Sequence, residues 1–476
     1  MATRIEPARD SGTAGDIVAA LVRKARAVQR IFARSTQEQL DEAATAVGWA
    51  IMNPAHNKAL AELAVKDTGL GVVADKIAKN HRKTLGLLRD LKGAISTGVI
   101  ADYPERGITE IARPAGVVAA VVPSTNPGAT PANNIINALK CGNAVIVAPS
   151  PKGYSTSALL LEFVHAELKR VGAPAELVQQ LPAPITRELT AELMKQADLV
   201  VVTGSQNNVR AGYSSGKPAL GVGTGNVAVI VDDSADCADA ARKIMASKIF
   251  DNATSCSSEN AVVIHDKVYD RMIAALTQEG GALLTAAEKI TLQAAMFPGG
   301  KLSPAVTAQP VRRICAVAGL TRPELVAARC LMVEESGAGK NHPFSGEKLS
   351  PVLAVYRARD FDHAFGIVRA IYHHQGDGHS VGIYTENDAH IRKLAHELTV
   401  ARVIVKQAHT FATGGSFDNS LPFSLSMGCG TWGGNSFSDN LNYRHFMNIT
   451  RIVRTIPDNK PSEADLFGPF WKKYGK

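Results

Sequence analysis

The chain has 476 residues, of which 45% are hydrophobic and 20% charged, a balance typical of a globular protein with two or three domains. Its formal charge of +8 is spread along the sequence and only 5% of residues are aromatic, so the concentrated basic stripe of a nucleic-acid-binding protein is missing. No apolar run is long enough to cross a bilayer, so we expect neither a nucleic-acid nor a membrane partner.

The predicted elements begin with helices over residues 15–93, where apolar residues recur at helical spacing, and we interpret this region as scaffold. From residue 116 onward, short apolar runs alternate with helical segments. This alternation predicts a parallel, doubly wound sheet, whose usual ligand is a nucleotide at the carboxyl ends of the strands. The strands expected in this first domain are residues 116–122, 144–148, 177–181, 198–203 and 227–231.

Two strand-to-helix loops carry polar residues at the edge where a nucleotide would bind. Ser124, Thr125 and Asn126 follow the first of these strands. Asn126 is either a plain turn residue or an amide that points into a cleft and stabilises an oxyanion. Gly204 and Ser205 open a helix after a later strand, where backbone N–H groups can hold a phosphate.

A second α/β series follows, with strands expected over residues 261–264, 330–334, 352–356, 380–384 and 401–405. We therefore expect a nucleotide-binding domain over residues 1–232 with arm strands near residues 106–122, and a second domain over residues 233–408. A C-terminal return over residues 409–476 completes the chain. Its strand-like run at residues 443–455 is expected to join another subunit.

Cys256 lies in a polar turn between an alanine-rich helical run and an apolar strand. A cysteine needed only for packing is normally surrounded by apolar residues. Two interpretations remain open from the residues alone, a buried inert thiol and a thiolate nucleophile.

The other cysteines and the histidines give no disulfide or metal signal. His373, His374 and His379 lie near glycines with no acidic or cysteine partner, so we expect no metal. The cysteines have no pairing rhythm, which predicts free thiols in a reducing compartment; they are Cys141, Cys237, Cys256, Cys315, Cys330 and Cys429.

Four segments, in this order, resemble the CoA-acylating branch of the aldehyde dehydrogenase superfamily. They are residues 123–127 (PSTNP), 250–260 (FDNATSCSSEN), 347–351 (EKLSP) and 429–436 (CGTWGGNS). The resemblance covers residues 15–455. It implies an α/β fold with two doubly wound parallel-sheet domains, one for NAD(P) and one for a catalytic thiol, and a small β arm for oligomerisation.

The resemblance also implies roles for single residues. Cys256 matches the family nucleophile, and Asn126 with the backbone N–H of Cys256 matches the oxyanion hole. Glu347 matches the glutamate that contacts the nicotinamide ribose. Further cofactor contacts are expected from Ser124, Thr125, Gly204, Ser205 and Gly223.

The chain departs from the hydrolytic branch of the family at residues 219–226 (ALGVGTGN). Hydrolytic members carry there a glutamate that activates water, whereas this chain has no carboxylate between Lys217 and Asp232. The glycines of this segment do not form the G-x-G-x-x-G fingerprint either. Because a CoA thiol needs less help from a base than water does, we expect CoA to be the cosubstrate that takes the acyl group from Cys256.

A second departure concerns the nicotinamide cofactor. NAD-preferring members carry a carboxylate for the ribose 2′-hydroxyl where this chain has residues 148–152 (APSPK). A carboxylate would repel a 2′-phosphate and a lysine would attract it, so we expect NADP, with NAD as the alternative. Ser150 and Lys152 are the expected contacts, and Lys152 could equally be a solvated lysine at a helix start.

The resemblance implies that the substrate is a small anionic aldehyde or its acyl-CoA. Sulfoacetaldehyde comes first, on the likeness of residues 429–448, and succinate semialdehyde and acetaldehyde are alternatives. A catalytically silent nucleotide-binding scaffold and a reductase of acyl phosphates are the rival classes. We also expect a homodimer or homotetramer. The first helix leaves no room for the N-terminal extension of microcompartment enzymes, so we expect the protein to be free in the cytoplasm.

Overall fold

Four helices open the part of the chain that the structure, a computed structural model, describes, residues 12–476. Thr13 and Thr36 begin the first two helices with capping boxes. The four are α1 (Ala14–Phe32), α2 (Gln37–Met52), α3 (Pro54–Thr68) and α4 (Val73–Leu91). The buried side of α4 is unusual because it carries lysines beside its leucines.

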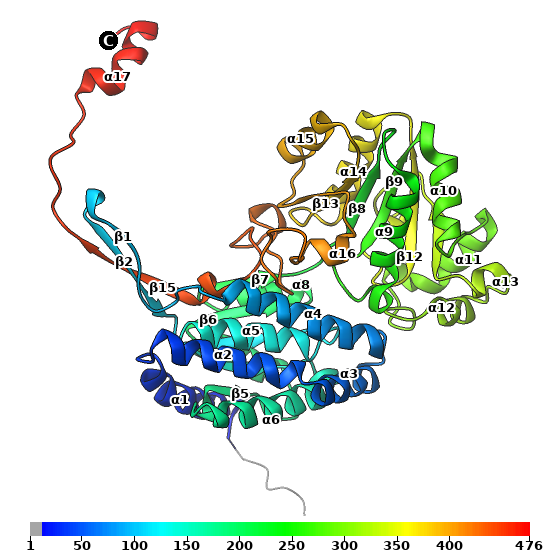
Figure 1. Cartoon of the computed structure of the whole chain (residues 1–476). Helices are drawn as coiled ribbons and strands as arrows, with labels where there is room; N and C mark the ends of the chain where they lie inside the picture. Colours follow the sequence, from blue (N-terminus) through cyan, green and yellow to red (C-terminus); the bar gives the residue numbers. More distant parts are fainter. Residues whose placement is uncertain (1–11) are drawn as a thin grey trace, which may run out of the picture.

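The first unit is built on a five-stranded parallel sheet in the order β5-β4-β3-β6-β7. Its three central strands are apolar and buried, as expected where helices cover both faces (Figure 1). The chain moves outward from β3 in both directions, so the switch point where such folds bind ligands lies between β3 and β6. The elements are β3 (Val117–Val121), α5 (Ala129–Lys140), β4 (Ala144–Ala148), α6 (Tyr154–Arg170), β5 (Val178–Gln180), α7 (Arg187–Gln196), β6 (Leu199–Thr203), α8 (Gln206–Tyr213) and β7 (Ala219–Val222).

The second unit is built on a seven-stranded parallel sheet in the order β10-β11-β12-β9-β8-β13-β14. Its strands are β8 (Val227–Val231), β9 (Glu259–His265), β10 (Gly281–Leu283), β11 (Cys330–Glu334), β12 (Val352–Ala358), β13 (Val381–Tyr384) and β14 (Val403–Val405). Its helices are α9 (Cys237–Ile249), α10 (Tyr269–Gln278), α11 (Ala286–Met296), α12 (Val311–Ala318), α13 (Pro323–Val326), α14 (Phe361–His374) and α15 (Asp388–Glu397). Cys256 lies between α9 and β9, at the amino end of the sheet.

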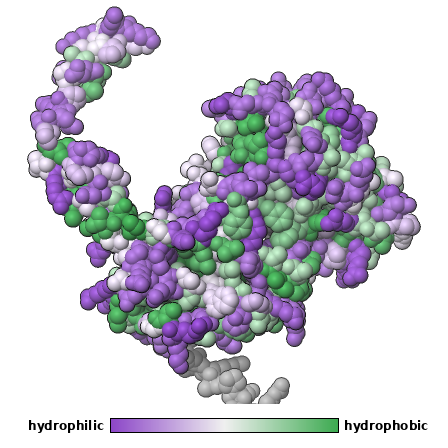
Figure 2. Space-filling model, viewed as in Figure 1, coloured by the Kyte–Doolittle hydropathy of each residue, from purple (hydrophilic) through white to green (hydrophobic). Residues whose placement is uncertain are grey.

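A three-stranded antiparallel sheet forms an arm that stands away from both units (Figure 1). It consists of β1 (Gly98–Tyr103), β2 (Ile108–Pro114) and β15 (Met447–Val453). Beyond it lies the exposed helix α17 (Glu463–Tyr474), and Figure 2 shows hydrophobic and hydrophilic residues mixed along the arm and this helix. The predicted fold class, two doubly wound parallel-sheet units with a small β arm, is confirmed.

Three segments differ from the elements expected from the sequence. Residues 117–121, grouped with the arm strands, form β3 at the centre of the first sheet, because a fully buried Val/Ala run needs cover on both faces. Residues 227–231, expected as a strand of the first domain, form β8 inside the second sheet, so the first unit ends before residue 227 and not at residue 232. The tail at residues 467–476 is mostly helix, begun by a capping box at Ser462.

The C-terminal part of the chain returns to the first unit after the short helix α16 (His409–Ala412). Phe423, Leu441 and Phe446 are fully buried in the hydrophobic core that the first sheet shares with helices α1, α2 and α4. Residues from both ends of the chain therefore contribute to the core of the first unit. Within residues 12–476, no helix is long and apolar enough to cross a membrane.

Candidate active site

A cavity of about 950 Å³ is lined by residues of both units. One wall comes from loops that follow β3, β4, β6 and β7, at the carboxyl end of the first sheet. The other comes from segments that precede β9 and β12, at the amino end of the second sheet. The ligand-binding edge of one parallel sheet thus faces the turn that carries Cys256, and Asn126 and Glu347 line the same space.

The residues predicted to bind the cofactor line this cavity, with one exception. Its lining includes Ser124, Thr125, Ser150, Gly204, Ser205 and Gly223. Lys152 lies just beyond, in a short 3-10 turn (Pro151–Gly153), is exposed and does not line the cavity. Arg187, at the start of α7, does line it and was not expected from the sequence.

The turn before Cys256 has a strained backbone. Asp251, Asn252 and Ala253 have φ angles of 51°, 51° and 58°, in the left-handed region that residues with a side chain adopt only at a cost. Hydrogen bonds from outside the turn hold it in place. The N–H of Asp251 donates to Asp75 Oδ2 at 2.8 Å, and Asn252 Nδ2 donates to the carbonyl of Ala308 at 3.2 Å.

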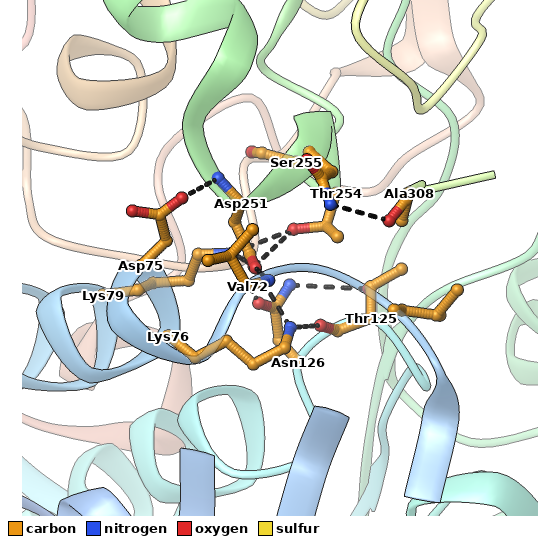
Figure 3. Close-up of polar contacts among 12 residues, drawn as sticks. Val72, Asp75, Lys76, Lys79, Thr125, Asn126, Asp251, Thr254, Ser255 and Ala308 are labelled. Carbon is orange, nitrogen blue, oxygen red and sulfur yellow. Dashed lines mark hydrogen bonds and ion pairs between the residues drawn. The ribbon is translucent and has the colours of Figure 1, made fainter. Parts of the chain in front are cut away.

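Two lysines of α4 connect this turn to the loop that carries Asn126 (Figure 3). Lys79 Nζ lies 2.6 Å from Asp251 Oδ2 and donates to Asn126 Oδ1 at 2.9 Å and Thr254 Oγ1 at 3.0 Å. Lys76 Nζ lies 3.1 Å from the same carboxylate oxygen. Because the carbonyl of the Asn126 amide faces Lys79, its NH₂ group is turned to the opposite side, where Nδ2 donates one hydrogen to Thr125 Oγ1 at 3.4 Å and keeps a second hydrogen for a ligand.

Burial sets the ionisation of this network. Burial alone would raise the pKa of Asp251, but the ammonium groups of Lys79 and Lys76 hold it below its usual value. Burial and the charge of Lys79 lower the pKa of Lys76 to about 8. The carboxylate therefore stays ionised, and with it the contacts that orient Asn126.

Cys256 is a half-buried thiol with a raised pKa. Burial, and after it the carboxylate of Glu347, raise the pKa of Cys256 to about 12. Burial raises the pKa of Glu347 to about 7, opposed by the N–H of Gly225, which donates to Oε1 at 3.1 Å. The thiol is thus protonated in the free protein at neutral pH.

The glycine-rich segment before β8 packs against the turn that carries Cys256. A Cβ atom added to Gly225 would lie 1.9 Å from the carbonyl oxygen of Cys256, and one added to Gly223 would lie 2.7 Å from Gln206 Nε2. Gly225 is required for the close approach of two backbone segments, whereas Gly223 leaves room for the end of the Gln206 side chain. The glycines of this segment, which do not match the dinucleotide-binding fingerprint, are therefore explained by close packing.

The lysines of α4 are the functional residues that the sequence interpretation missed. Residues 15–93 were interpreted as scaffold, and the lysines were not singled out. Yet Lys76, Lys79, Lys83 and Leu87 are three or four positions apart, so they lie on one side of a helix. Because Asn80 and Thr84 lie on the same side, no apolar pattern in the sequence marked these lysines as buried.

His379, one of the histidines not expected to bind a metal, belongs to a buried hydrogen-bonded group. His379 is buried and shares a 2.7 Å hydrogen bond with Ser380, whose hydroxyl lies 2.8 Å from His409 Nε2. Burial lowers the pKa of His379 to about 3, so the ring is neutral. Across residues 12–476, no group of three or more His, Cys, Asp or Glu side chains is placed to hold a metal.

Comparison with known proteins gives matches over nearly the whole chain. The aldehyde dehydrogenase family model matches residues 9–326. The sulfoacetaldehyde dehydrogenase (acylating) of Cupriavidus necator is 60% identical over 470 residues, 99% of this chain and 95% of that protein. The Bilophila wadsworthia protein of the same name is 42% identical over 96% of this chain and 98% of its own.

A solved structure gives the same result. The acetylating aldehyde dehydrogenase from Geobacillus thermoglucosidasius superposes with a TM-score of 0.90 at 33% identity, covering 94% of this chain and 98% of its own. The matched length, the identities and the two parallel sheets agree. The chain belongs to the aldehyde dehydrogenase family, on its acylating branch.

Proposed function

We propose that the protein oxidises sulfoacetaldehyde to sulfoacetyl-CoA with CoA and a nicotinamide cofactor, reversibly, through a thioester on Cys256. The observation that carries this proposal is the placement of Cys256, Asn126 and Glu347 on one cavity. The name of the Cupriavidus necator relative supports the substrate. Succinate semialdehyde and acetaldehyde are the alternative aldehydes.

We assign the chemistry of the aldehyde to Cys256 and Asn126. The Cys256 thiolate adds to the aldehyde carbon, and the resulting oxyanion accepts hydrogen bonds from Asn126 Nδ2 and the N–H of Cys256. The nicotinamide, when bound, takes the hydride of this thiohemiacetal. Cys256 then holds the acyl group as a thioester, which the CoA thiolate attacks to release Cys256.

Water competes poorly for this thioester. Among the described residues that line the cavity, Glu347 is the one carboxylate, and its Oε1 accepts the N–H of Gly225. We assign Glu347 to the nicotinamide ribose. No other carboxylate on the cavity can activate water, whereas a thiol of appreciable thiolate content needs no base.

We propose that the first unit, the sheet β5-β4-β3-β6-β7 with its helices, binds NADP, and that the second unit, which begins at β8, carries the thiol. Gly204, Ser205 and the N-terminus of α8 lie at the switch point of the sheet, where a pyrophosphate fits. Ser150 and Arg187 line the cavity and Lys152 lies beside it, so the residues near the ribose carry positive charge. Ser124, Thr125 and Gly223 complete the proposed contacts, and NAD is the alternative.

We propose a homodimer or homotetramer in the cytoplasm, with residues 409–476 and the arm strands as the joining segment. β15 is an edge strand whose Ile452 and Val453 are 40% and 74% exposed. Exposed edges of this kind pair with other strands. The free state of all six cysteines suits a reducing compartment.

Omitting CoA should stop turnover. With aldehyde and NADP alone, about one nicotinamide per site should be reduced, because the acyl group then stays on Cys256. Adding CoA should restore steady turnover, measured by absorbance of the reduced nicotinamide. Cys256→Ala should remove the burst and the turnover. Equal rates with and without CoA would contradict thiolysis.

Asn126→Ala should lower kcat by about 10²- to 10³-fold, because an oxyanion donor is lost. Lys79→Met should lower kcat as well, because the Asn126 amide loses the contact that orients it. Single-turnover reduction of the nicotinamide measures both effects. Asn341→Ala, in an exposed turn, is the control. A rate for Asn126→Ala within threefold of the parent would remove Asn126 from the oxyanion role.

Alkylation of Cys256 by iodoacetamide should accelerate about tenfold per pH unit between pH 7 and 9, because a thiol far below its pKa gains thiolate at that rate. Glu347→Gln should react faster than the parent at pH 9, since the ionised carboxylate raises the thiol pKa. The rate at which the label is incorporated into the protein measures both effects, with Cys256→Ala as the blank. A rate that levels off by pH 9 would show a thiol pKa that is not raised.

Light scattering after size exclusion should give two or four times the mass of one chain. Replacing Ile452 and Val453 together by lysine should shift the protein toward the monomer, because charge blocks pairing at the β15 edge. Ile290→Lys replaces an apolar side chain of α11 that is also exposed, and should leave the mass unchanged. A monomeric parent, or a lysine variant that still assembles, counts against the arm as the interface.

A further inference from the structure

Two more cations of α4, Arg82 and Lys83, lie on the cavity that holds Cys256. Lys76 and Lys79 are neutralised in part by Asp251, which both contact. Among the described residues, neither Arg82 nor Lys83 has a carboxylate within ion-pair distance. The carboxylate that acts on Arg82 from further away, Asp418, is exposed. The α4 side of the cavity thus carries more positive than negative charge.

The hydrogen bonds of Lys83 are made to neutral groups only. Its side chain is 8% exposed, and Nζ donates to the carbonyls of Gly414 at 2.6 Å and Ser424 at 3.2 Å. Its third N–H is left for a ligand. Burial, and after it the charges of Arg82 and Lys79, lower the pKa of Lys83 well below its ordinary value. An incoming anion would stabilise the ammonium form of Lys83, so the site favours a negatively charged ligand.

Arg82, the neighbour of Lys83 in the chain, also makes its hydrogen bonds to neutral groups. Nη2 donates to the carbonyls of Phe411 and Gly415 and to the hydroxyl of Ser416, at 2.7, 3.3 and 3.2 Å. These contacts fix the plane of the guanidinium group and leave Nε and Nη1 without partners among the described residues. A planar fork with free donors suits an oxyanion with several oxygens, such as a sulfonate or a carboxylate.

The position of these cations fits a short substrate. Ser424 lines the cavity next to Leu425 and Met427, so apolar wall lies beside the cations. The two cations and Cys256 line the same cavity, so the cations and the thiol face one space. In sulfoacetaldehyde one methylene separates the aldehyde carbon from the anionic group, so both ends must be bound within one small space.

We propose that Arg82 and Lys83 form the sub-site that binds the anionic group of the aldehyde while Cys256 attacks its carbonyl carbon. This assignment rests on the proposed function, in that it requires an anionic aldehyde to react at Cys256. It names the residues that would separate sulfonated and carboxylated aldehydes from neutral ones. CoA phosphates are the rival ligands of the same cations.

The test is steady-state kinetics with sulfoacetaldehyde, succinate semialdehyde and propionaldehyde, for Arg82→Gln, Lys83→Gln and the parent. The ratio of kcat/KM for an anionic aldehyde to that for propionaldehyde should fall about 10- to 100-fold in each variant, as expected for a lost hydrogen bond to a charged group. Arg89→Gln removes a cation of the same helix that does not line the cavity, and its ratio should equal that of the parent.

Other outcomes overturn the sub-site. A ratio of kcat/KM values that is unchanged in both variants overturns the sub-site. This includes an equal loss of activity with all three aldehydes, which would show a role in folding or structure. A raised KM for CoA with propionaldehyde, at an unchanged ratio, assigns the cations to CoA instead. A parent that accepts succinate semialdehyde but not sulfoacetaldehyde refutes the proposed substrate, while the ratio for succinate semialdehyde still tests the sub-site.

Discussion

The buried carboxylate of Asp251 is the group on which the active-site geometry depends. It accepts the N–H of Val72 at 2.8 Å, lies within ion-pair distance of Lys76 and Lys79, and accepts the hydroxyl of Thr254 at 2.7 Å. Removing one partner of a buried ion pair costs about 3–5 kcal/mol, because an uncompensated charge remains. Here two ammonium groups would be left, so the carboxylate also fixes how α4 packs on the turn.

This arrangement explains how a strained turn can be kept next to a reactive thiol. Left-handed residues without glycine cost about 1–3 kcal/mol each, so three in succession persist only where other contacts determine them. Asp251 is itself one of the three, and its side chain supplies the contacts that offset the strain of its backbone. The Cys256 thiol and the Asn126 amide are therefore held by one network, and neither can move far without the other.

The sequence pointed to Cys256 and Asn126, which line the cavity, more readily than to the residues that hold them in place. Cys256 and Asn126 lie in short polar segments next to apolar strands. Such a change from apolar to polar residues can be recognised in the sequence itself. Lys79 lies in a helix of ordinary composition, and its partner Asp251 is 172 positions away. Lysines on a helix normally face solvent, so their burial follows only from tertiary packing. The sheet order and the exclusion of Lys152 from the cavity lining likewise depend on contacts that no local pattern records.

The preference for CoA over water follows from the same packing. Close contacts surround the segment before β8, and a Cβ on Gly221 would lie 2.8 Å from Val209 Cγ1. A Cβ on Gly223 would meet the end of the Gln206 side chain, and one on Gly225 would meet the backbone of Cys256. A carboxylate at position 225 would therefore have to displace the backbone that places Cys256. Gly225, which allows the two units to meet closely, thus also keeps a water-activating base from that position, and we infer that the acyl group remains for a thiol that needs no base.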